Sequence, residues 1–255
     1  MKPTVLLTND DGIGTAFLHA LVAACETEGF TVLVAAPAGE RSWIGRAFSR
    51  HHEVTVAAYP GLGEAAWSID GTPSDCVNIA LGHLLTAKPD VVLSGLNIGF
   101  NATMPLCLSS GTLAGATEGA AWGIPAVACS LDLAPALFEQ IHRTPAICPP
   151  ELRPHLTVAC RHAARFAKAL VGTTNERLVL HSLNYPATVT AETPLERTRP
   201  ALVRHGKLFT PSALGYRFAW NDGEIVDTDA TTDLAVLERG GISHTILDYS
   251  QVGRI

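Results

Sequence analysis

Short, almost wholly apolar runs alternate with amphipathic stretches through the first two thirds of the chain. The apolar runs cover residues 4–8, 31–37, 90–95, 125–130 and 177–186, and each has the length of a strand buried on both faces. The stretches between them place apolar residues at helical spacing, which predicts helices over residues 15–28, 74–85, 111–122 and 156–171. Strands and helices that alternate in this way predict an α/β fold, with a mainly parallel sheet covered by helices on both faces.

The pattern changes after Pro186. Residues 188–229 mix polar and apolar positions, carry many charges and show no helical face. A structureless loop of that length is uncommon, since most loops are shorter than about 12 to 15 residues. We therefore expect antiparallel hairpins that project from the core. The chain then divides into a core over residues 1–186, a protruding hairpin region over 187–231, and a closing segment over 232–255.

Composition excludes several classes of protein. Of the 255 residues, 47% are hydrophobic and 16% are charged, which is typical of a globular chain and not of a disordered one. The formal net charge of −6 argues against a nucleic-acid partner, which needs a basic surface. No stretch has the roughly 18 to 20 apolar residues that span a bilayer, so we expect no membrane partner.

Two further features favour the cytoplasm. The first apolar run covers only residues 5–7 before the acidic residues begin, which is shorter than the roughly 7 to 15 residues of a signal-peptide core. The six cysteines form no C-x-x-C pair, and most lie in apolar context. This favours small buried side chains in a reducing compartment over disulfides or zinc ligands.

Four polar loops follow predicted strands or open a predicted helix. They are TNDDG (8–12), PAGERSWIG (37–45), SGLNIGFN (94–101) and SSGT (109–112). Ligands of open α/β sheets bind just beyond the carboxyl ends of the strands. The topology therefore predicts that these four loops share one crevice.

The side chains in these loops are rich in oxygen. Asp10 and Asp11 are adjacent carboxylates that repel each other, and a divalent cation between them would remove that repulsion. With the Ser42 hydroxyl and the Asn97 amide oxygen they form a set of hard ligands, which suits Mg²⁺, Mn²⁺ or Ca²⁺ better than zinc. Taken alone, N-D-D-G favours an ordinary turn, in which Asp10 caps the next helix and Asp11 is solvated.

The SSGT loop presents backbone N–H groups and hydroxyls at the start of a predicted helix. Such a helix start suits a phosphate group, which Ser110, Gly111 and Thr112 would bind. Capping of the helix by Ser110 or Thr112 explains the motif equally well. The asparagine loop is more specific, because two asparagines and two glycines directly after a buried strand aim polar side chains at one point.

Taken together and in this order, the motifs resemble the SurE family of survival proteins, which are metal-dependent nucleotidases. LLTNDDG is similar to the acidic N-terminal motif of that family, APAGERS to the loop that ends in a ligand serine, and DGTPSDCV (70–77) to its G-T-P-x-D-C-V motif. SGLNIGFN resembles its asparagine loop, SGT-x-x-x-A its phosphate-side helix start, and TDLAVLERGGIS (232–243) its closing segment. Six ordered motifs over nearly the whole chain are far more specific than any one of them.

The resemblance implies a Rossmann-like three-layer α/β/α sandwich, with a C-terminal β-hairpin extension that supports homodimers or homotetramers by exchange between subunits. It implies a site for Mg²⁺ or Mn²⁺ made of Asp10, Asp11, Ser42 and Asn97. The implied reaction is hydrolysis of nucleoside monophosphates, with Asn101 and residues 110–112 orienting the phosphate. Asp10 would position or deprotonate a water molecule, or would itself attack phosphorus to give an aspartyl-phosphate.

The chain departs from the family pattern in three places. Residues 102–109 read ATMPLCLS where Gly-Asp-Asp and then Tyr are usual, Trp43 stands where Gly is usual, and HTIL (244–247) replaces Thr-Pro-Leu. We expect Trp43 either to stack on the base of the substrate or to fold onto the sheet edge. The missing acids leave two rival functions: a nucleotide-binding or scaffold protein with little catalysis, or a phosphatase for another small phosphomonoester.

Overall fold

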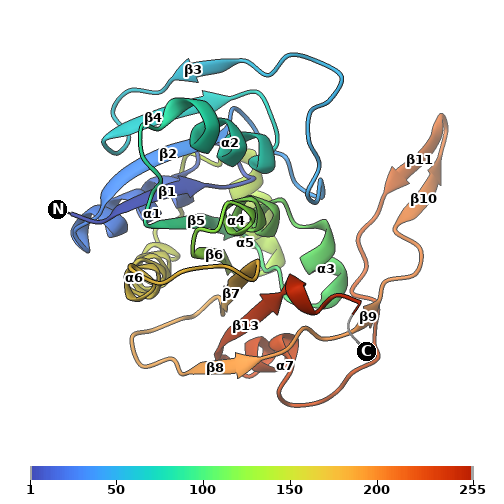
Figure 1. The fold of residues 1–255 in the computed structure, drawn as a ribbon. Helices are drawn as coiled ribbons and strands as arrows, with labels where there is room; N and C mark the ends of the chain where they lie inside the picture. Colours follow the sequence, from blue (N-terminus) through green and yellow to red (C-terminus); the bar gives the residue numbers. More distant parts are fainter. Residues whose placement is uncertain (1, 254–255) are drawn as a thin grey trace.

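A mixed, mostly parallel sheet forms the centre of the molecule. The computed structural model describes residues 2–253, and within them the strands of this sheet lie in the order β3-β4-β2-β1-β5-β6-β7-β13-β8 (Figure 1). Neighbouring strands are parallel except where β3 meets β4 and β7 meets β13. The strands are β1 (Thr4–Thr8), β2 (Thr31–Pro37), β3 (Val56–Ala58), β4 (Ala65–Ile69), β5 (Val91–Ile98), β6 (Ala126–Leu131), β7 (Val179–Tyr185), β8 (Leu195–Thr198) and β13 (Ile242–Asp248).

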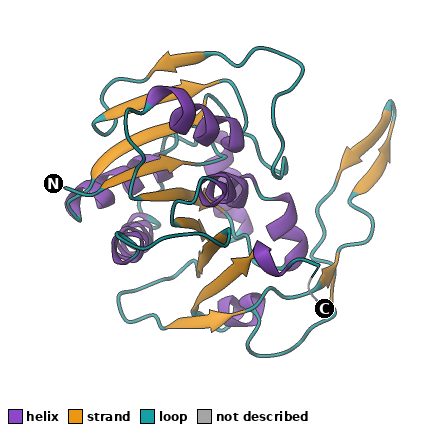
Figure 2. Ribbon diagram, in the orientation of Figure 1, coloured by secondary structure: helices purple, strands orange, loops and turns teal. Residues whose placement is uncertain are grey.

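Helices cover both faces of this sheet (Figures 1 and 2). The helices are α1 (Ala16–Thr27), α2 (Pro73–Ile79), α3 (Met104–Ser109), α4 (Gly111–Ala121), α5 (Pro135–Arg143), α6 (Arg153–Ala169) and α7 (Asp233–Glu238), with a π-helical segment at Ala80–Leu84 and a 3₁₀ turn at Tyr249–Gln251. Within residues 2–253, none of the helices combines the length and apolar character that a bilayer crossing needs.

Side chains of strand β1 pack into two apolar clusters, one on each face of the sheet. α1 and α6 pack together on one face, and α2 and α4 pack together on the other. Val5 and Leu7 join the apolar cluster that contains the buried side chains of α1 and α6. Leu6, which points the opposite way, joins the cluster of α2 and α4. The predicted three-layer α/β/α sandwich with a mainly parallel sheet is confirmed.

The predicted strands and helices are present, with changes at some of their ends. β1 and β2 have the predicted bounds. β5 differs, because it continues beyond residue 95 to Ile98, so that Asn97 lies within the strand and not in a loop after it. The reason is burial: all eight residues of β5 are buried, and pairing with β6 resumes at Asn97 after an irregularity in register.

The chain after Tyr185 is built differently from the core. β8 runs parallel to β13 at the edge of the central sheet. β9 (Val203–Arg204) pairs with β12 (Glu224–Ile225), and β10 (Phe209–Ser212) pairs with β11 (Gly215–Phe218), both in antiparallel fashion. The β10–β11 hairpin projects from the rest of the molecule (Figure 1). The expected projecting hairpin is therefore present. The division of the chain at residues 186 and 231 stays a prediction. Residues 254–255, which belong to the predicted closing segment, lie outside the described residues.

Two glycines allow α4 to lie close against the sheet. A Cβ atom at Gly115 would stand 2.7 Å from Thr8 Cγ2, and one at Gly119 would stand 2.6 Å from Val92 Cβ. Larger residues at these positions would therefore push the helix away from β1 and β5. The close packing brings the first turn of α4 to the carboxyl end of β1, where polar loops gather.

Candidate metal and phosphate site

The predicted polar loops meet at one edge of the sheet. β1 lies between β2 and β5, so consecutive parts of the chain extend the sheet in opposite directions from β1. The carboxyl ends of β1 and β5 form a topological switch point, which is where open α/β sheets bind their ligands. The TNDDG loop leaves β1 at this point, and β5 ends here with Asn97 and Ile98.

Internal hydrogen bonds fix the TNDDG loop. The Asn9 side-chain amide donates to the Gly12 carbonyl at 3.0 Å and to the Thr15 hydroxyl at 3.3 Å. Gly12 has a φ of 102°, a conformation that favours glycine. Thr15 is the N-cap of α1 and accepts a hydrogen bond from the Leu18 N–H. Asp10 is therefore not the helix cap, and its carboxylate is left for another role.

Both carboxylates are buried, and each is anchored by a different element. Asp10 and Asp11 expose 4% and 8% of their surface. Asp10 Oδ1 accepts a hydrogen bond from the Thr112 hydroxyl at 2.6 Å, and Asp11 Oδ2 accepts one from the Ile98 N–H at 3.0 Å. Asp11 is thus not a solvated turn residue. The pair joins the end of β1 to the end of β5 and to the start of α4.

The two carboxyl groups carry charge that the surrounding protein compensates poorly. Burial raises the pKa of Asp10 from its ordinary value of 3.8 to about 6, although its hydrogen bond with Thr112 acts in the opposite direction. Burial also raises the pKa of Asp11 well above its ordinary value, with the neighbouring charge of Asp10 as the second cause. Within residues 2–253, neither carboxylate has a salt-bridge partner. A divalent cation would stabilise both charges.

The other two predicted ligands flank this pair. The Asn97 amide nitrogen donates to the Gly99 carbonyl at 2.6 Å, which leaves the amide oxygen for a ligand. Ser42 is exposed and follows Arg41, whose N–H donates to the Asp10 carbonyl at 2.7 Å. The backbone therefore holds Ser42 beside Asp10. In the described part of the chain, neither side chain is bonded directly to a carboxylate.

The donor set fits a hard divalent cation. Its atoms are carboxylate, hydroxyl and amide oxygens, which are the ligands that Mg²⁺, Mn²⁺ and Ca²⁺ prefer. Asn9 Oδ1, next to Asp10 in the chain, is buried without a hydrogen-bond partner among residues 2–253. No group of three or more His, Cys, Asp or Glu side chains within that range is close enough to share an ion. The chemistry of this donor set therefore differs from that of a zinc site.

The first turn of α4 faces the carboxylates. Ser110 is the N-cap, and its hydroxyl accepts a hydrogen bond from the Leu113 N–H at 3.0 Å. Backbone N–H groups of the first turn have no partner inside a helix. The Thr112 N–H points toward the Asp10 carboxylate closely enough to lower its pKa. The helix start can therefore stabilise an anion even though Ser110 caps the helix, so the two explanations of the SSGT motif are compatible.

Asn101 belongs to the same network. Its side-chain amide donates to the Thr112 hydroxyl at 3.3 Å and to the Ser130 hydroxyl at 3.0 Å. Its backbone N–H donates to Asn184 Oδ1 at 2.7 Å. Thr112 thereby links Asn101 to Asp10. The carboxyl edge of the sheet and the start of α4 bring together Asp10, Asp11, Asn97, Asn101, Ser110, Gly111 and Thr112, with exposed Ser42 beside them.

The close approach of Gly111 to the acidic loop leads to a prediction. A Cβ atom at Gly111 would stand 2.7 Å from Asp10 Cβ and 3.2 Å from the Arg41 carbonyl oxygen. We expect Gly111→Ala to displace Asp10 and to lower kcat of the phosphate-ester hydrolysis that the resemblance implies by roughly 10-fold or more, because a shift of about 1 Å at a reacting centre costs up to 10²-fold. Gly14→Ala is the matched control, since a Cβ there meets no atom within 4 Å. Equal rates for the two variants would contradict the prediction.

Trp43 does not fold onto the sheet edge, so that expectation is wrong. Its ring lies against the end of β11 and the chain that follows it, with centroid distances of 5.1 Å to Phe218 and 5.6 Å to Trp220. Its φ of 61° lies in the left-handed region, which costs a residue other than glycine about 1 to 2 kcal/mol. No pattern in the sequence relates these two distant segments, so sequence reasoning misses Phe218 and Trp220.

Sequence reasoning also misses residues that support the site. Ser130 and Asn184 lie near the carboxyl ends of β6 and β7, so the strand-end rule that selects the other loops would have found them. Asp233 accepts hydrogen bonds from the Thr103 N–H at 2.9 Å and from the Ala201 N–H at 2.8 Å. It thereby fixes the chain after Asn101 to the base of the hairpin region, a contact for which the sequence holds no signal.

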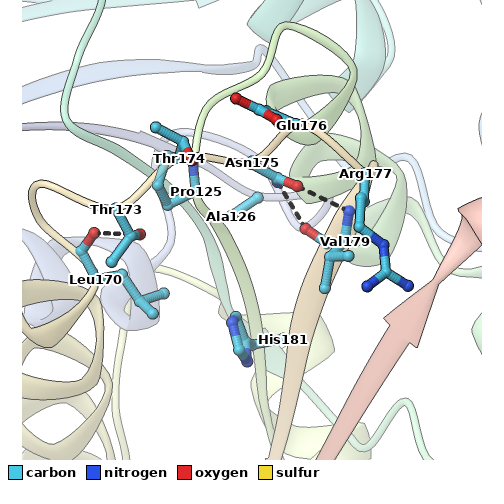
Figure 3. Close-up of a pocket in the computed structure, with 10 residues that line it drawn as sticks. All are labelled: Pro125, Ala126, Leu170, Thr173, Thr174, Asn175, Glu176, Arg177, Val179 and His181. Carbon is cyan, nitrogen blue, oxygen red and sulfur yellow. Dashed lines mark hydrogen bonds between the residues drawn. The ribbon is translucent and has the colours of Figure 1, made fainter.

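A cavity of about 350 Å³ lies away from this site. Asn175, Arg177 and His181 are among its lining residues (Figure 3). The Asn175 side chain closes a turn there: it donates to the Val179 carbonyl at 2.7 Å and accepts from the Val179 N–H at 2.9 Å. The cavity lies at the amino ends of β6 and β7, opposite the carboxyl ends, and contains none of the predicted site residues.

Several known proteins are similar to this chain in sequence, and one solved structure is similar to it in fold. A family model described as "Survival protein SurE" matches residues 5–207. The 5'-nucleotidase SurE of Desulfovibrio desulfuricans is 34% identical over 250 residues, which are 96% of this chain and 92% of that protein. The 5'-nucleotidase SurE of Methanopyrus kandleri is 34% identical over 255 residues, which are 98% of this chain and 92% of that protein. The crystal structure of the SurE protein from Aquifex aeolicus has a TM-score of 0.71 and 27% identity, over 96% of this chain and 93% of that one. The chain belongs to the SurE family of survival proteins.

Proposed function

We propose that this protein is a divalent-metal-dependent phosphomonoesterase that hydrolyses nucleoside monophosphates to nucleoside and phosphate. The observation that carries the proposal is the pair of adjacent buried carboxylates, Asp10 and Asp11, of which Asp10 accepts a hydrogen bond from Thr112 at the start of α4. A cation and a phosphate group are the two ligands that this arrangement suits. The relatives from Desulfovibrio desulfuricans and Methanopyrus kandleri are named 5'-nucleotidases, which supports the same activity.

The proposed metal ligands are Asp10, Asp11, Ser42 and Asn97, and the proposed ion is Mg²⁺ or Mn²⁺. When bound, such an ion withdraws charge from the phosphoryl oxygens and makes water more acidic. Ca²⁺ prefers the same oxygen ligands in a looser geometry, so we expect it to bind as a substitute.

The remaining polar residues would bind the ester and direct water to it. Residues 110–112 at the start of α4 would hold the phosphoryl oxygens, with the Asn101 amide beside them. Water attacks phosphorus in line with the ester oxygen, the bond from phosphorus to that oxygen breaks, and the leaving nucleoside oxygen takes up a proton from solvent. Asp10 orients the water and accepts its proton. We favour water over Asp10 as the nucleophile because the Thr112 hydroxyl already engages Asp10 Oδ1.

A hydrolysis screen tests this function. The substrates are nucleoside 5'- and 3'-monophosphates, ribose 5-phosphate and p-nitrophenyl phosphate, each with Mn²⁺ or Mg²⁺. We expect phosphate release to be most efficient from a nucleoside monophosphate. Binding of nucleotides without release would favour the rival scaffold function, for which the absence of acids in residues 102–109 is the motive. More efficient release from the base-free esters would favour a phosphatase with another substrate.

We also propose that the protein assembles as a homodimer or homotetramer through the β10–β11 hairpin. The hairpin projects from the core, and Leu214 at its tip is fully exposed. Replacing residues 207–221 with a short Gly-Ser linker is expected to give monomers in light scattering, while the circular dichroism of the core is retained. This deletion spares β8, which belongs to the central sheet. A full-length protein that is monomeric at micromolar concentration would contradict the proposal.

The cytoplasm is the proposed location. All six cysteines are free, and five of them are buried. Burial raises the pKa of the Cys25 thiol to about 12, which keeps it in the unreactive thiol form. Free thiols of this kind are typical of a reducing compartment.

A further inference from the structure

We propose that the projecting hairpin region completes the substrate site, and that Trp43, Phe218 and Trp220 form an aromatic platform on which the base of a nucleoside monophosphate stacks. This inference rests on the proposed function and deepens it, because it identifies where the nucleoside end of the substrate binds. The platform combines Trp43, from the loop of residues 37–45 that contains Ser42 (the serine loop), with Phe218 at the end of β11 and Trp220 after it.

The Trp43 ring contacts both of the other rings, and all three residues remain partly exposed to a ligand. Trp43 lies 5.1 Å from Phe218 and 5.6 Å from Trp220 between ring centroids, with tilted planes. The exposed fractions of the three residues are 46%, 43% and 43%. Aromatic residues that cluster around Trp43 and keep nearly half of their surface in solvent offer aromatic surface to a planar ligand.

Neighbouring residues hold Trp220 in place. The His205 ring packs against it with a centroid distance of 4.8 Å, and His205 Nδ1 is 3.1 Å from the Asn221 carbonyl. The Trp220 indole N–H donates to Asp222 Oδ1 at 3.1 Å. A ring fixed in this way loses little conformational freedom when a base stacks on it, which favours binding.

The platform lies beside the carboxylate pair. The serine loop is bonded to the candidate site on both sides of Trp43: the Arg41 N–H donates to the Asp10 carbonyl at 2.7 Å, and the Gly45 N–H donates to the Ser109 carbonyl at 2.8 Å. Trp43 is two residues from each anchor. Because two residues span at most about 7 Å, the Trp43 backbone cannot lie far from Asp10 or from the start of α4. A phosphate bound there therefore brings its nucleoside within reach of the platform.

The left-handed backbone of Trp43 is a second sign of function. Its φ is 61°, a conformation that side chains other than glycine rarely adopt. Backbone strain of this kind persists where the surrounding structure enforces it, and it gathers at ligand sites. Here the strained backbone presents the indole toward the hairpin region and away from the sheet.

A nucleobase fits this platform better than a second copy of the chain does. In the hairpin register, Phe218 pairs with Phe209 at the open end, next to the core, whereas Gly215 pairs with Ser212 at the tip. The more exposed apolar residues, Leu214 and Tyr216, lie toward the tip, where a partner subunit can reach them. The platform sits beside the site instead, and every base has a flat face that stacks on aromatic rings.

The test compares two substrates that differ only by the base: adenosine 5'-monophosphate and ribose 5-phosphate. Steady-state kinetics are measured with Mn²⁺ for the wild type, Trp220→Ala and Trp43→Gly. Both variants are expected to raise KM for adenosine 5'-monophosphate by roughly 5- to 100-fold, the scale of one stacked base, and to change KM for ribose 5-phosphate little. Glycine at position 43 accepts the left-handed backbone, so that variant keeps the loop intact. Ile147→Ala, a control at an exposed apolar side chain outside the hairpin region, is expected to behave as the wild type with both substrates.

Binding of adenosine, which has no phosphate, gives a second readout through quenching of tryptophan fluorescence. Saturable quenching that Trp220→Ala weakens supports the platform. Equal losses with both substrates would overturn the inference, because the aromatic contact would then only hold the Ser42 loop in place. Variants that match the wild type in both assays would also overturn it. If adenosine binds but no nucleoside monophosphate is hydrolysed, the proposed function fails and the platform stands.

Discussion

Removal of divalent metal with EDTA is expected to abolish hydrolysis of nucleoside monophosphates, and added Mn²⁺ or Mg²⁺ is expected to restore it. Asp10 and Asp11 place two like charges in a buried crevice, and within residues 2–253 no basic side chain neutralises them. Without a cation, those charges repel the phosphate group of the substrate directly. Phosphate release is measured before chelation, in EDTA and after return of each metal.

Elemental analysis of the same samples provides the control for this experiment. The metal content should fall and recover with the activity. Full activity in EDTA, in protein that contains no metal, would show that the carboxylate pair has another role. Recovery with Zn²⁺ but not with Mn²⁺ or Mg²⁺ would contradict the assignment of an oxygen-only ligand set.

The chelated protein should also respond to pH in a defined direction. The pKa of Asp10 in the folded protein is raised from 3.8 to about 6, so between these values the folded state holds a proton that the unfolded chain has released. The contribution of Asp10 to the stability of the metal-free protein is therefore fully present below about pH 4, and it is lost as the pH rises through about 6. A rise of this size corresponds to about 3 kcal/mol, and the raised pKa of Asp11 acts in the same direction.

Thermal melts at about pH 5 and about pH 7.5 measure this effect. In EDTA, Tm should be lower at the higher pH. Bound Mn²⁺ should remove the difference, because the ion stabilises the ionised carboxylates. A metal-free Tm that rises between the two pH values would mean that other groups outweigh the pair.

Hydrophobic pattern predicts the core of this fold well because the core depends on local sequence. A strand buried on both faces, such as β1, needs consecutive apolar residues, and a helix such as α1 needs an apolar face. The same pattern says little about β3, whose residues are all exposed, or about β13, which is only partly buried toward its end. These strands form because β4 and β7 offer them an edge to pair with.

The candidate site also contains residues that can be predicted from the sequence and residues that cannot. Loops at strand ends are visible in the sequence, so the two aspartates, Asn97 and Asn101 can be selected from the sequence alone. The contact of Trp43 with Phe218 and Trp220 depends on where the hairpin region packs, and no local pattern encodes that. The role of Asp233 is hidden for the same reason, since it bonds to backbone N–H groups far away in the chain.

Asp11→Asn is expected to leave the fold intact and to lower kcat/KM by roughly 10²-fold or more, the scale of losing one electrostatic contributor. Asparagine has nearly the same shape and keeps an oxygen that can accept the Ile98 N–H, so the anchor to β5 remains. What the change removes is one of the two charges that we propose to hold the cation. The affinity for Mn²⁺, measured by isothermal titration calorimetry, should fall together with the rate.

The stability of the Asp11→Asn variant distinguishes a metal-binding role of Asp11 from a merely structural one. Burial disfavours the charged form of Asp11, so a neutral side chain at this position should make the metal-free protein at least as stable as the wild type near neutral pH. A structural anchor would instead lose stability on substitution. Asp90→Asn is the matched control, because Asp90 also accepts one backbone N–H, that of Thr4 at 2.7 Å, but lies at the opposite edge of the sheet. A near-normal rate and unchanged Mn²⁺ affinity for Asp11→Asn would exclude Asp11 as a metal ligand.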